Sequence, residues 1–178
     1  MEKQDKQMTV IIRLSHRRLL YDIANNAFVV GLSESGERRQ WVQDIVEGQN
    51  ADRVERVLWR AFCQLRDRLA GCGRIDRVET CYRERVMHPQ SIEAGNGPAS
   101  HEYLIKVKMR CTVSKTTADY WGILCYEYMT AMAIADWLEM TSSEQATRWE
   151  AKGEKAWKNL MDSIARTGGQ QRRTLPAI

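Results

Sequence analysis

The stretch YLIKVKMRCTV, residues 103–113, decides the sheet of this protein, because its apolar side chains recur at every second position. From residue 106 onward, lysine, arginine and threonine fill the intervening positions. A period of two places alternate side chains on opposite faces of a strand, so the pattern predicts a half-buried β-strand with a charged outer face. Its apolar positions are Tyr103, Ile105, Val107, Met109, Cys111 and Val113.

A partner for this strand is expected upstream, around residues 78–86. Between the two segments, Pro89, Gly95 and Pro98 mark a loop. Residues 75–113 are therefore predicted to form a long antiparallel β-hairpin that projects from the body of the protein. A hairpin alone is not stable in water, so helices must cover its apolar face or another subunit must extend its edge.

Two helices are predicted after this strand. Residues 117–140 have helical periodicity and are apolar over more than one face, which indicates burial between other helices or in a subunit interface. Thr141 and Glu144 have the spacing of a capping box, which predicts that the next helix begins at once. That helix should end at Gly168 and pack antiparallel to the first.

The N-terminal segment begins with residues 8–14, whose β-branched side chains predict a short strand or an extended arm. Ser15 is a suitable N-cap for a helix over residues 16–30. Gly31 is expected to end that helix in the left-handed conformation.

The next segment contains the clearest amphipathic helix in the first half of the chain. Short helical turns are expected around residues 41–46, after which Asp52 is a suitable cap for a helix that continues to Leu69. The opposite face of this helix carries a basic row, which is typical of a solvated surface but would also suit an acidic partner. The row consists of Arg53, Arg56 and Arg60.

These elements predict a mainly α member of the α+β class, a helical bundle with a long antiparallel β-hairpin and an extended C-terminal tail. At 178 residues the chain has the size of one domain and can bury a core without disulfides or metal. The expected organisation is a single domain over residues 1–169 and a tail or arm over residues 170–178.

The composition excludes several classes of protein. The chain is 43% hydrophobic and 28% charged, as in ordinary globular proteins, and no stretch is long and apolar enough for a membrane span. The polar start of the sequence is unlike a signal peptide, so a cytoplasmic origin is expected. A net charge of +4 is too small to require a nucleic-acid partner.

No motif predicts chemistry. The five cysteines lack CxxC spacing, the three histidines form no HExxH motif, and neither a phosphate-binding loop nor a nucleophile elbow is present. Asp136 and Glu139 lie at helical spacing, but paired acids are common on helix surfaces. The sequence therefore predicts a protein that is not an enzyme, with no metal, no cofactor and no small-molecule substrate.

The order of the elements resembles that of bacteriophage neck proteins, the head-tail connector or adaptor class. The resemblance lies in the helical segments 52–69 and 117–166, the hairpin around residues 103–113, and the tail 170–178. It implies a virion protein, assembled in the host cytoplasm, that forms a homo-oligomeric ring on the portal. The implied partners are the portal and other neck or tail proteins, with transient contact to DNA in a central channel.

The resemblance also implies that the hairpin and the tail reach neighbouring subunits. On this interpretation, edge-strand pairing and tail docking both add contacts between subunits. The predicted interface residues are Tyr103, Ile105, Val107 and Met109 of the strand and Arg172, Arg173, Leu175, Pro176 and Ile178 of the tail.

An alternative interpretation is a nucleic-acid-binding protein. In that case Arg53, Arg56 and Arg60, together with arginine doublets elsewhere, would hold phosphates, and the affinity would fall steeply with salt. The two interpretations differ in whether the isolated chain holds free DNA tightly.

Overall fold

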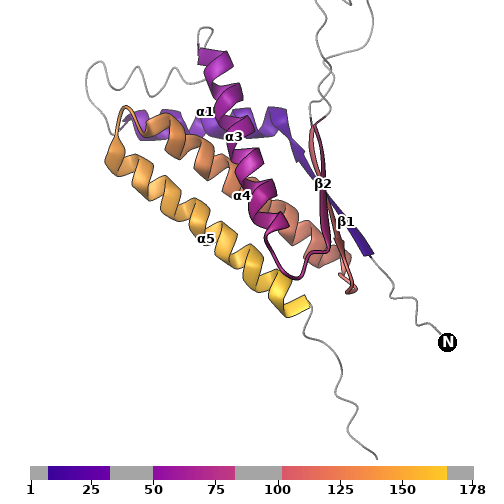
Figure 1. Ribbon diagram of the computed structural model, residues 1–178. Coiled ribbons are helices and arrows are strands. Elements are labelled where there is room, and N and C mark those ends of the chain that lie inside the picture. Colours follow the sequence, from indigo (N-terminus) through magenta and orange to yellow (C-terminus); the bar gives the residue numbers. More distant parts are fainter. Residues whose placement is uncertain (1–7, 33–49, 83–101, 168–178) are drawn as a thin grey trace, which may run out of the picture.

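The computed structural model describes residues 8–32, 50–82 and 102–167 (Figure 1). In these ranges four helices pack against a small antiparallel sheet, which confirms the mainly helical α+β class. In chain order the elements are β1 (Met8–Ser15), α1 (His16–Leu32), α3 (Ala51–Ala70), β2 (Arg77–Tyr82), β3 (Glu102–Met109), α4 (Lys115–Leu138) and α5 (Ser143–Thr167).

Some predicted elements lie outside the described residues. They are the turns around residues 41–46, the loop that contains Pro89 and Pro98, the projecting tip of the hairpin, and the tail 170–178.

The sheet has three strands in the order β1-β3-β2. β2 and β3 pair antiparallel, from Arg77 opposite Lys108 to Tyr82 opposite Tyr103, which confirms the base of the predicted hairpin. β3 ends at Met109 rather than at residue 113. β1 pairs with the other side of β3, so the strand predicted as an exposed edge is the centre of the sheet.

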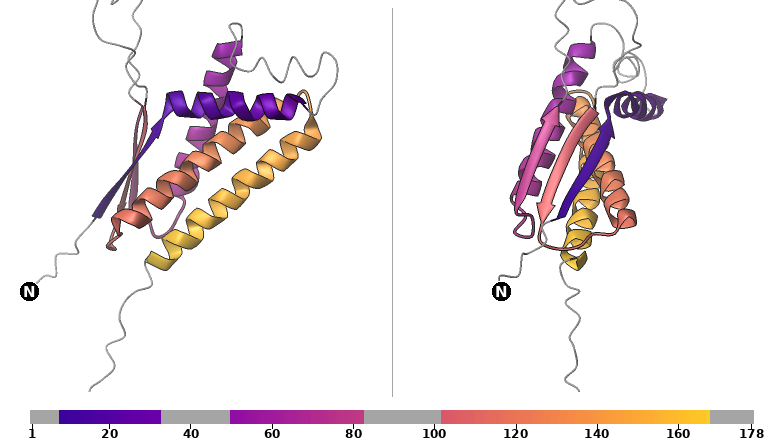
Figure 2. Two further views of the ribbon diagram at one scale, coloured as in Figure 1. Left: turned by 180° about the vertical axis from the view of Figure 1, so that it is seen from behind. Right: turned by 90° about the vertical axis from the view of Figure 1, so that its right-hand side faces the viewer.

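One face of this sheet forms one side of the hydrophobic core. The register places Val10 opposite Val107, Ile12 opposite Ile105, and Leu14 opposite Tyr103. All six side chains are buried, and the helices lie on their side of the sheet (Figure 2). The period of two in the sequence therefore describes β3 correctly, with its apolar residues on the helical side.

Helix α4 lies at the centre of the molecule. It packs against α5 along its length and also contacts α3, α1 and β1 (Figures 1 and 2). Trp121, Tyr128 and Trp137 are at most 3% exposed. Of the two explanations for its wide apolar surface, burial between other helices therefore accounts for most of that surface. Gly153 on α5 allows close approach, because a Cβ there would lie 2.8 Å from the Met132 sulfur.

The helix ends differ in detail from the prediction. Gly31 lies inside α1 and is buried, and α3 begins after Asn50, so Asp52 is in its first turn. The Thr141 hydroxyl donates to the Leu138 carbonyl at the end of α4 instead of capping α5. Thr141 therefore forms no capping box, and α5 begins at Ser143.

Candidate interaction surfaces

The strand residues predicted as a subunit interface are in the core of the chain. Tyr103, Ile105, Val107 and Met109 are each at most 1% exposed, beneath the helices. Both edges of β3 are paired with strands of the same chain. The prediction for these four residues is therefore wrong, because neither their side chains nor their backbone edge is accessible to another subunit.

The basic row on α3 is partly engaged inside the molecule. The Arg60 guanidinium lies 2.7 Å from the Asp136 carboxylate on α4. Arg53 lies over the Trp137 ring, 4.7 Å from its centroid, and donates a hydrogen bond to the Met140 sulfur at 3.2 Å. Arg56 is exposed. Two of the three cations thus help to hold α3 against α4.

The tail residues predicted as interface elements lie outside the described residues. They are Arg172, Arg173, Leu175, Pro176 and Ile178.

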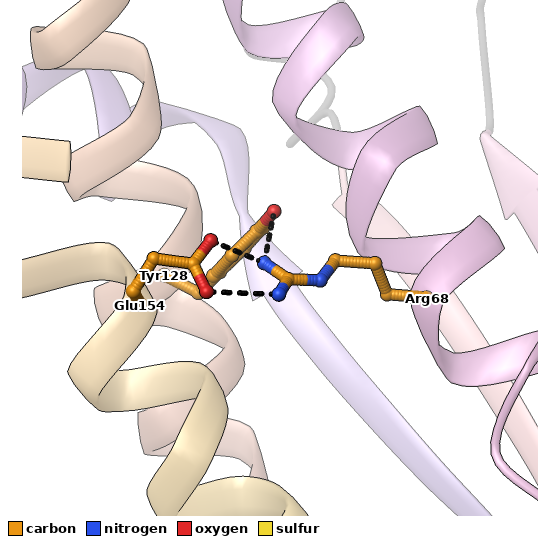
Figure 3. Close-up of polar contacts among 3 residues, drawn as sticks. All are labelled: Arg68, Tyr128 and Glu154. Carbon is orange, nitrogen blue, oxygen red and sulfur yellow. Dashed lines mark hydrogen bonds and ion pairs between the residues drawn. The ribbon is translucent and has the colours of Figure 1, made fainter. Parts of the chain in front are cut away.

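A polar clamp that was not predicted joins α3 to the α4–α5 pair (Figure 3). The two terminal nitrogens of Arg68 donate to the Glu154 carboxylate at 2.6 and 2.8 Å. One of them also contacts the Tyr128 hydroxyl at 3.4 Å, and the guanidinium lies 4.6 Å from the Trp157 ring centroid. A bidentate pair with an aromatic contact fixes the relative position of three helices.

The contact with Arg68 also changes the pKa of the Glu154 carboxylate. The hydrogen bond from Arg68 holds the pKa of Glu154 below its ordinary value. The carboxylate therefore contributes stability above the pKa of the unfolded chain, and that contribution is lost as the pH falls through the lower pKa of the folded chain. It should be present in full at neutral pH.

Replacing Arg68 with Ala should lower the free energy of unfolding at pH 7 by about 1–2 kcal/mol, because the pair is bidentate but partly exposed. Urea unfolding at pH 7 and pH 3 measures this, and the difference from the wild type should narrow at pH 3. Arg66→Ala is the matched control, since Arg66 pairs with its neighbour Asp67 at the surface. Equal losses of unfolding free energy in the two variants would contradict a stabilising role for the Arg68 contacts.

The described residues show little that suits catalysis. They contain no group of three His, Cys, Asp or Glu side chains that could hold a metal ion. Burial raises the pKa of Cys125 to about 12, so its thiol stays protonated at neutral pH and is a poor nucleophile. The buried His16 ring lies 2.8 Å from the Glu55 carboxylate, a contact that joins the start of α1 to α3.

A groove of about 690 Å³ runs beside the outer edge of β1. Its walls are β1, the first half of α4 and the start of α1. Ile11 and Ile123 line it and are 49% and 56% exposed. Because the sheet of the described residues ends at β1, the groove combines a strand edge with exposed apolar side chains.

A second groove, of about 350 Å³, lies between α3 and the α4–α5 pair. Its lining includes the carboxylates of Asp136, Glu139 and Glu150, against one cation, Arg60. The rest of the lining mixes the apolar residues Val57, Ala61, Met132, Ala135 and Ala146 with the polar residues Gln64, Ser143 and Thr147. We call this surface the acidic groove.

A third cleft, of about 400 Å³, lies between α1, α4 and α5. Asp22 and Glu127 are on one side, and Lys152 and Lys155 are on the other. The Tyr126 hydroxyl donates to the Asp22 carboxylate at 2.6 Å, which ties α4 to α1 at the edge of the cleft. Its charges are balanced, so it indicates no particular class of ligand.

The outer side of α1 carries an exposed apolar stripe. Its side chains are between 50% and 70% exposed, and their spacing of three, four and seven residues places them close together on the helix. Such a stripe is a candidate contact surface for another protein. Its residues are Tyr21, Phe28, Val29 and Leu32.

Comparison of the chain with protein-family models, with curated proteins and with solved structures found no match. Among the described helices, none has the length and apolar character that crossing a membrane requires.

Proposed function

We propose that this chain is a structural assembly protein, a ring-forming subunit of a bacteriophage head-tail connector in the neck of the virion. It joins the portal to the tail by subunit packing rather than by chemistry. The order of helices, hairpin and tail that resembles this class supports the proposal. So does a surface on which grooves and apolar patches, rather than converging reactive groups, are the prominent features.

The observation that carries the proposal is the groove beside β1. A strand edge with free backbone groups can pair with an extended segment of another chain, and Ile11 and Ile123 offer apolar contact beside it. The stripe on α1 is a second exposed apolar surface of the same chain. Together they provide the contacts that a subunit interface requires, in place of the buried β3 residues.

Light scattering coupled to size-exclusion chromatography tests assembly. We expect the purified chain to have the mass of several subunits, and electron micrographs to contain rings. Ile123→Lys should shift the mass toward a single chain, because the change replaces one of the two exposed apolar side chains beside the β1 edge with a charge. Ala165→Lys adds the same charge at an exposed position of α5 and should leave the mass unchanged. A monomeric wild type at all concentrations would contradict the proposal.

Partner binding tests the place in the virion. We expect the assembled chain to co-sediment with rings of the portal protein encoded in the same genome. Ile123→Lys should reduce this binding together with assembly if the ring is the binding form, whereas Ala165→Lys should not.

The nucleic-acid alternative predicts a different result. Arg53 and Arg60 already contact Trp137 and Asp136, which leaves Arg56 as the member of the row that is free of these contacts. We therefore expect weak binding of free DNA in a gel shift, even at low salt. Tight binding that weakens steeply with salt would favour the alternative instead.

A further inference from the structure

We infer that the acidic groove receives the basic segment 170–178, QQRRTLPAI, of a second copy of this chain. The inference rests on the proposed function, since it names the contact by which one subunit holds the next.

The acidic groove is suited to a cationic ligand. Glu139 and Glu150 are exposed, and neither forms an ion pair within the part of the chain that the structure describes. Asp136 is neutralised by Arg60 at 2.7 Å. Two carboxylates therefore remain uncompensated in the lining, although Arg53 lies nearby over Trp137.

The end of α4 lies at this groove. The carbonyl end of a helix carries a partial negative charge that cations stabilise, yet the last turn of α4 holds no basic residue. Glu139 follows that turn directly. The groove thus contains the carbonyl end of α4 and the first turn of α5, whose partial charges are opposite, so the two free carboxylates give it its negative character. An arginine pair would compensate these carboxylates.

Segment 170–178 has the matching chemistry. Arg172 and Arg173 can form charge-assisted hydrogen bonds with the carboxylates, and Leu175 and Pro176 follow immediately. The floor of the groove beside the carboxylates is apolar, with Met132 half-buried and Val57, Ala61, Ala135 and Ala146 at most 9% exposed. The segment thus places its arginines next to apolar residues, just as the groove places its carboxylates next to apolar side chains.

The position of Glu139 assigns the segment to another copy, because an arginine pair that engages both Glu139 and Glu150 must reach the far end of α5. Helix α5 has 25 residues and is about 36 Å long, and Glu139 precedes its first residue as the C-cap of α4. The α4–α5 turn therefore lies at the opposite end of α5 from Thr167 (Figure 1). Arg172 is only five residues past Thr167, a distance that extended chain spans in at most about 18 Å. The arginine pair therefore cannot reach Glu139 of its own chain. Contact between different surfaces of two copies is the type that builds rings when the rotation between subunits closes.

A labelled peptide of residues 168–178, titrated into the full chain and followed by fluorescence anisotropy, tests the groove directly. We expect saturable binding that weakens at least tenfold in Glu139→Lys and in Glu150→Lys. Asp162→Lys, at an exposed acid elsewhere on α5, should leave the affinity unchanged. A peptide with both arginines replaced by Glu should not bind. Absence of binding by the unmodified peptide, including the case in which another segment fills the groove, overturns the inference.

A charge exchange tests the same contact in the assembly. Chains with Glu139→Lys and Glu150→Lys should lose mass in light scattering, as should chains with Arg172→Glu and Arg173→Glu. Combining all four changes in one chain should restore assembly. If the wild type forms rings while these variants and the peptide show no effect, the inference fails and the proposed function stands. If the wild type is monomeric, the proposed function fails, and the peptide titration still decides whether the groove binds the segment.

Discussion

Replacing Ile105 with Asp should unfold the chain, with a loss of more than about 4 kcal/mol in the free energy of unfolding. Ile105 is fully buried on the central strand, opposite Ile12 and Thr80. A carboxylate there would lose its hydration without gaining a partner. Circular dichroism and urea unfolding of the purified variant measure the result.

The Ile105→Asp variant shows whether Ile105 lies in the core of one chain or in an interface between subunits. At a subunit interface, the same change would leave a folded, helical monomer with a cooperative unfolding transition. Ile105→Ala is the milder companion, with an expected loss of about 2–5 kcal/mol, and it keeps the measurement feasible if the Asp variant does not fold. Lys106→Thr changes the opposite face of β3 and should alter the stability by less than about 1 kcal/mol.

Strand β3 shows what the alternation of apolar and polar residues in a sequence can and cannot predict. Alternation depends only on the two faces of a strand, so it correctly identified which side chains of residues 103–109 are apolar and point to the core. It contains no information on which strands cover the two edges. The pairing of β1 with β3 joins residues about a hundred positions apart and depends on how the helices pack. The alternation of residues therefore could not show whether β3 lies at the edge or at the centre of the sheet.

Helices were predicted more completely than their ends. The helical spacing of apolar residues identified α1, α3, α4 and α5, because a period near 3.6 persists over many residues. A helix cap depends on a single hydroxyl or carboxylate group. Several residues near each end of a helix could supply that group. At the α4–α5 turn, the Thr141 side chain bonds to the preceding helix, a choice that spacing alone does not decide.

The polar contacts between elements had no local signal at all. Arg68 meets Glu154 and Tyr128 from positions 86 and 60 residues away along the chain. The acidic groove likewise takes its lining from three helices. Asp136 and Glu139 were noticed in the sequence as a pair of acids, but only the packing of α3 and α5 shows that they line a groove together with Glu150.

Replacing Trp121 with Ala should lower the free energy of unfolding by about 3–5 kcal/mol. The Trp121 ring is fully buried at the centre of the molecule, and its indole nitrogen donates to the Ser163 hydroxyl on α5 at 2.8 Å. Truncation therefore leaves a large cavity and removes a hydrogen bond between the two longest helices. Urea unfolding monitored by circular dichroism gives the difference.

Two further variants divide this loss between packing and hydrogen bonding. Trp121→Phe retains an aromatic ring in the core, and Ser163→Ala removes only the acceptor, so each should be less severe than Trp121→Ala. In the double variant the two losses should not add, because both changes remove the same hydrogen bond. Strict additivity would show that the bond does not contribute. A loss below about 1 kcal/mol for Trp121→Ala would contradict the central burial of α4, on which the packing of α1, α3, α5 and the sheet depends.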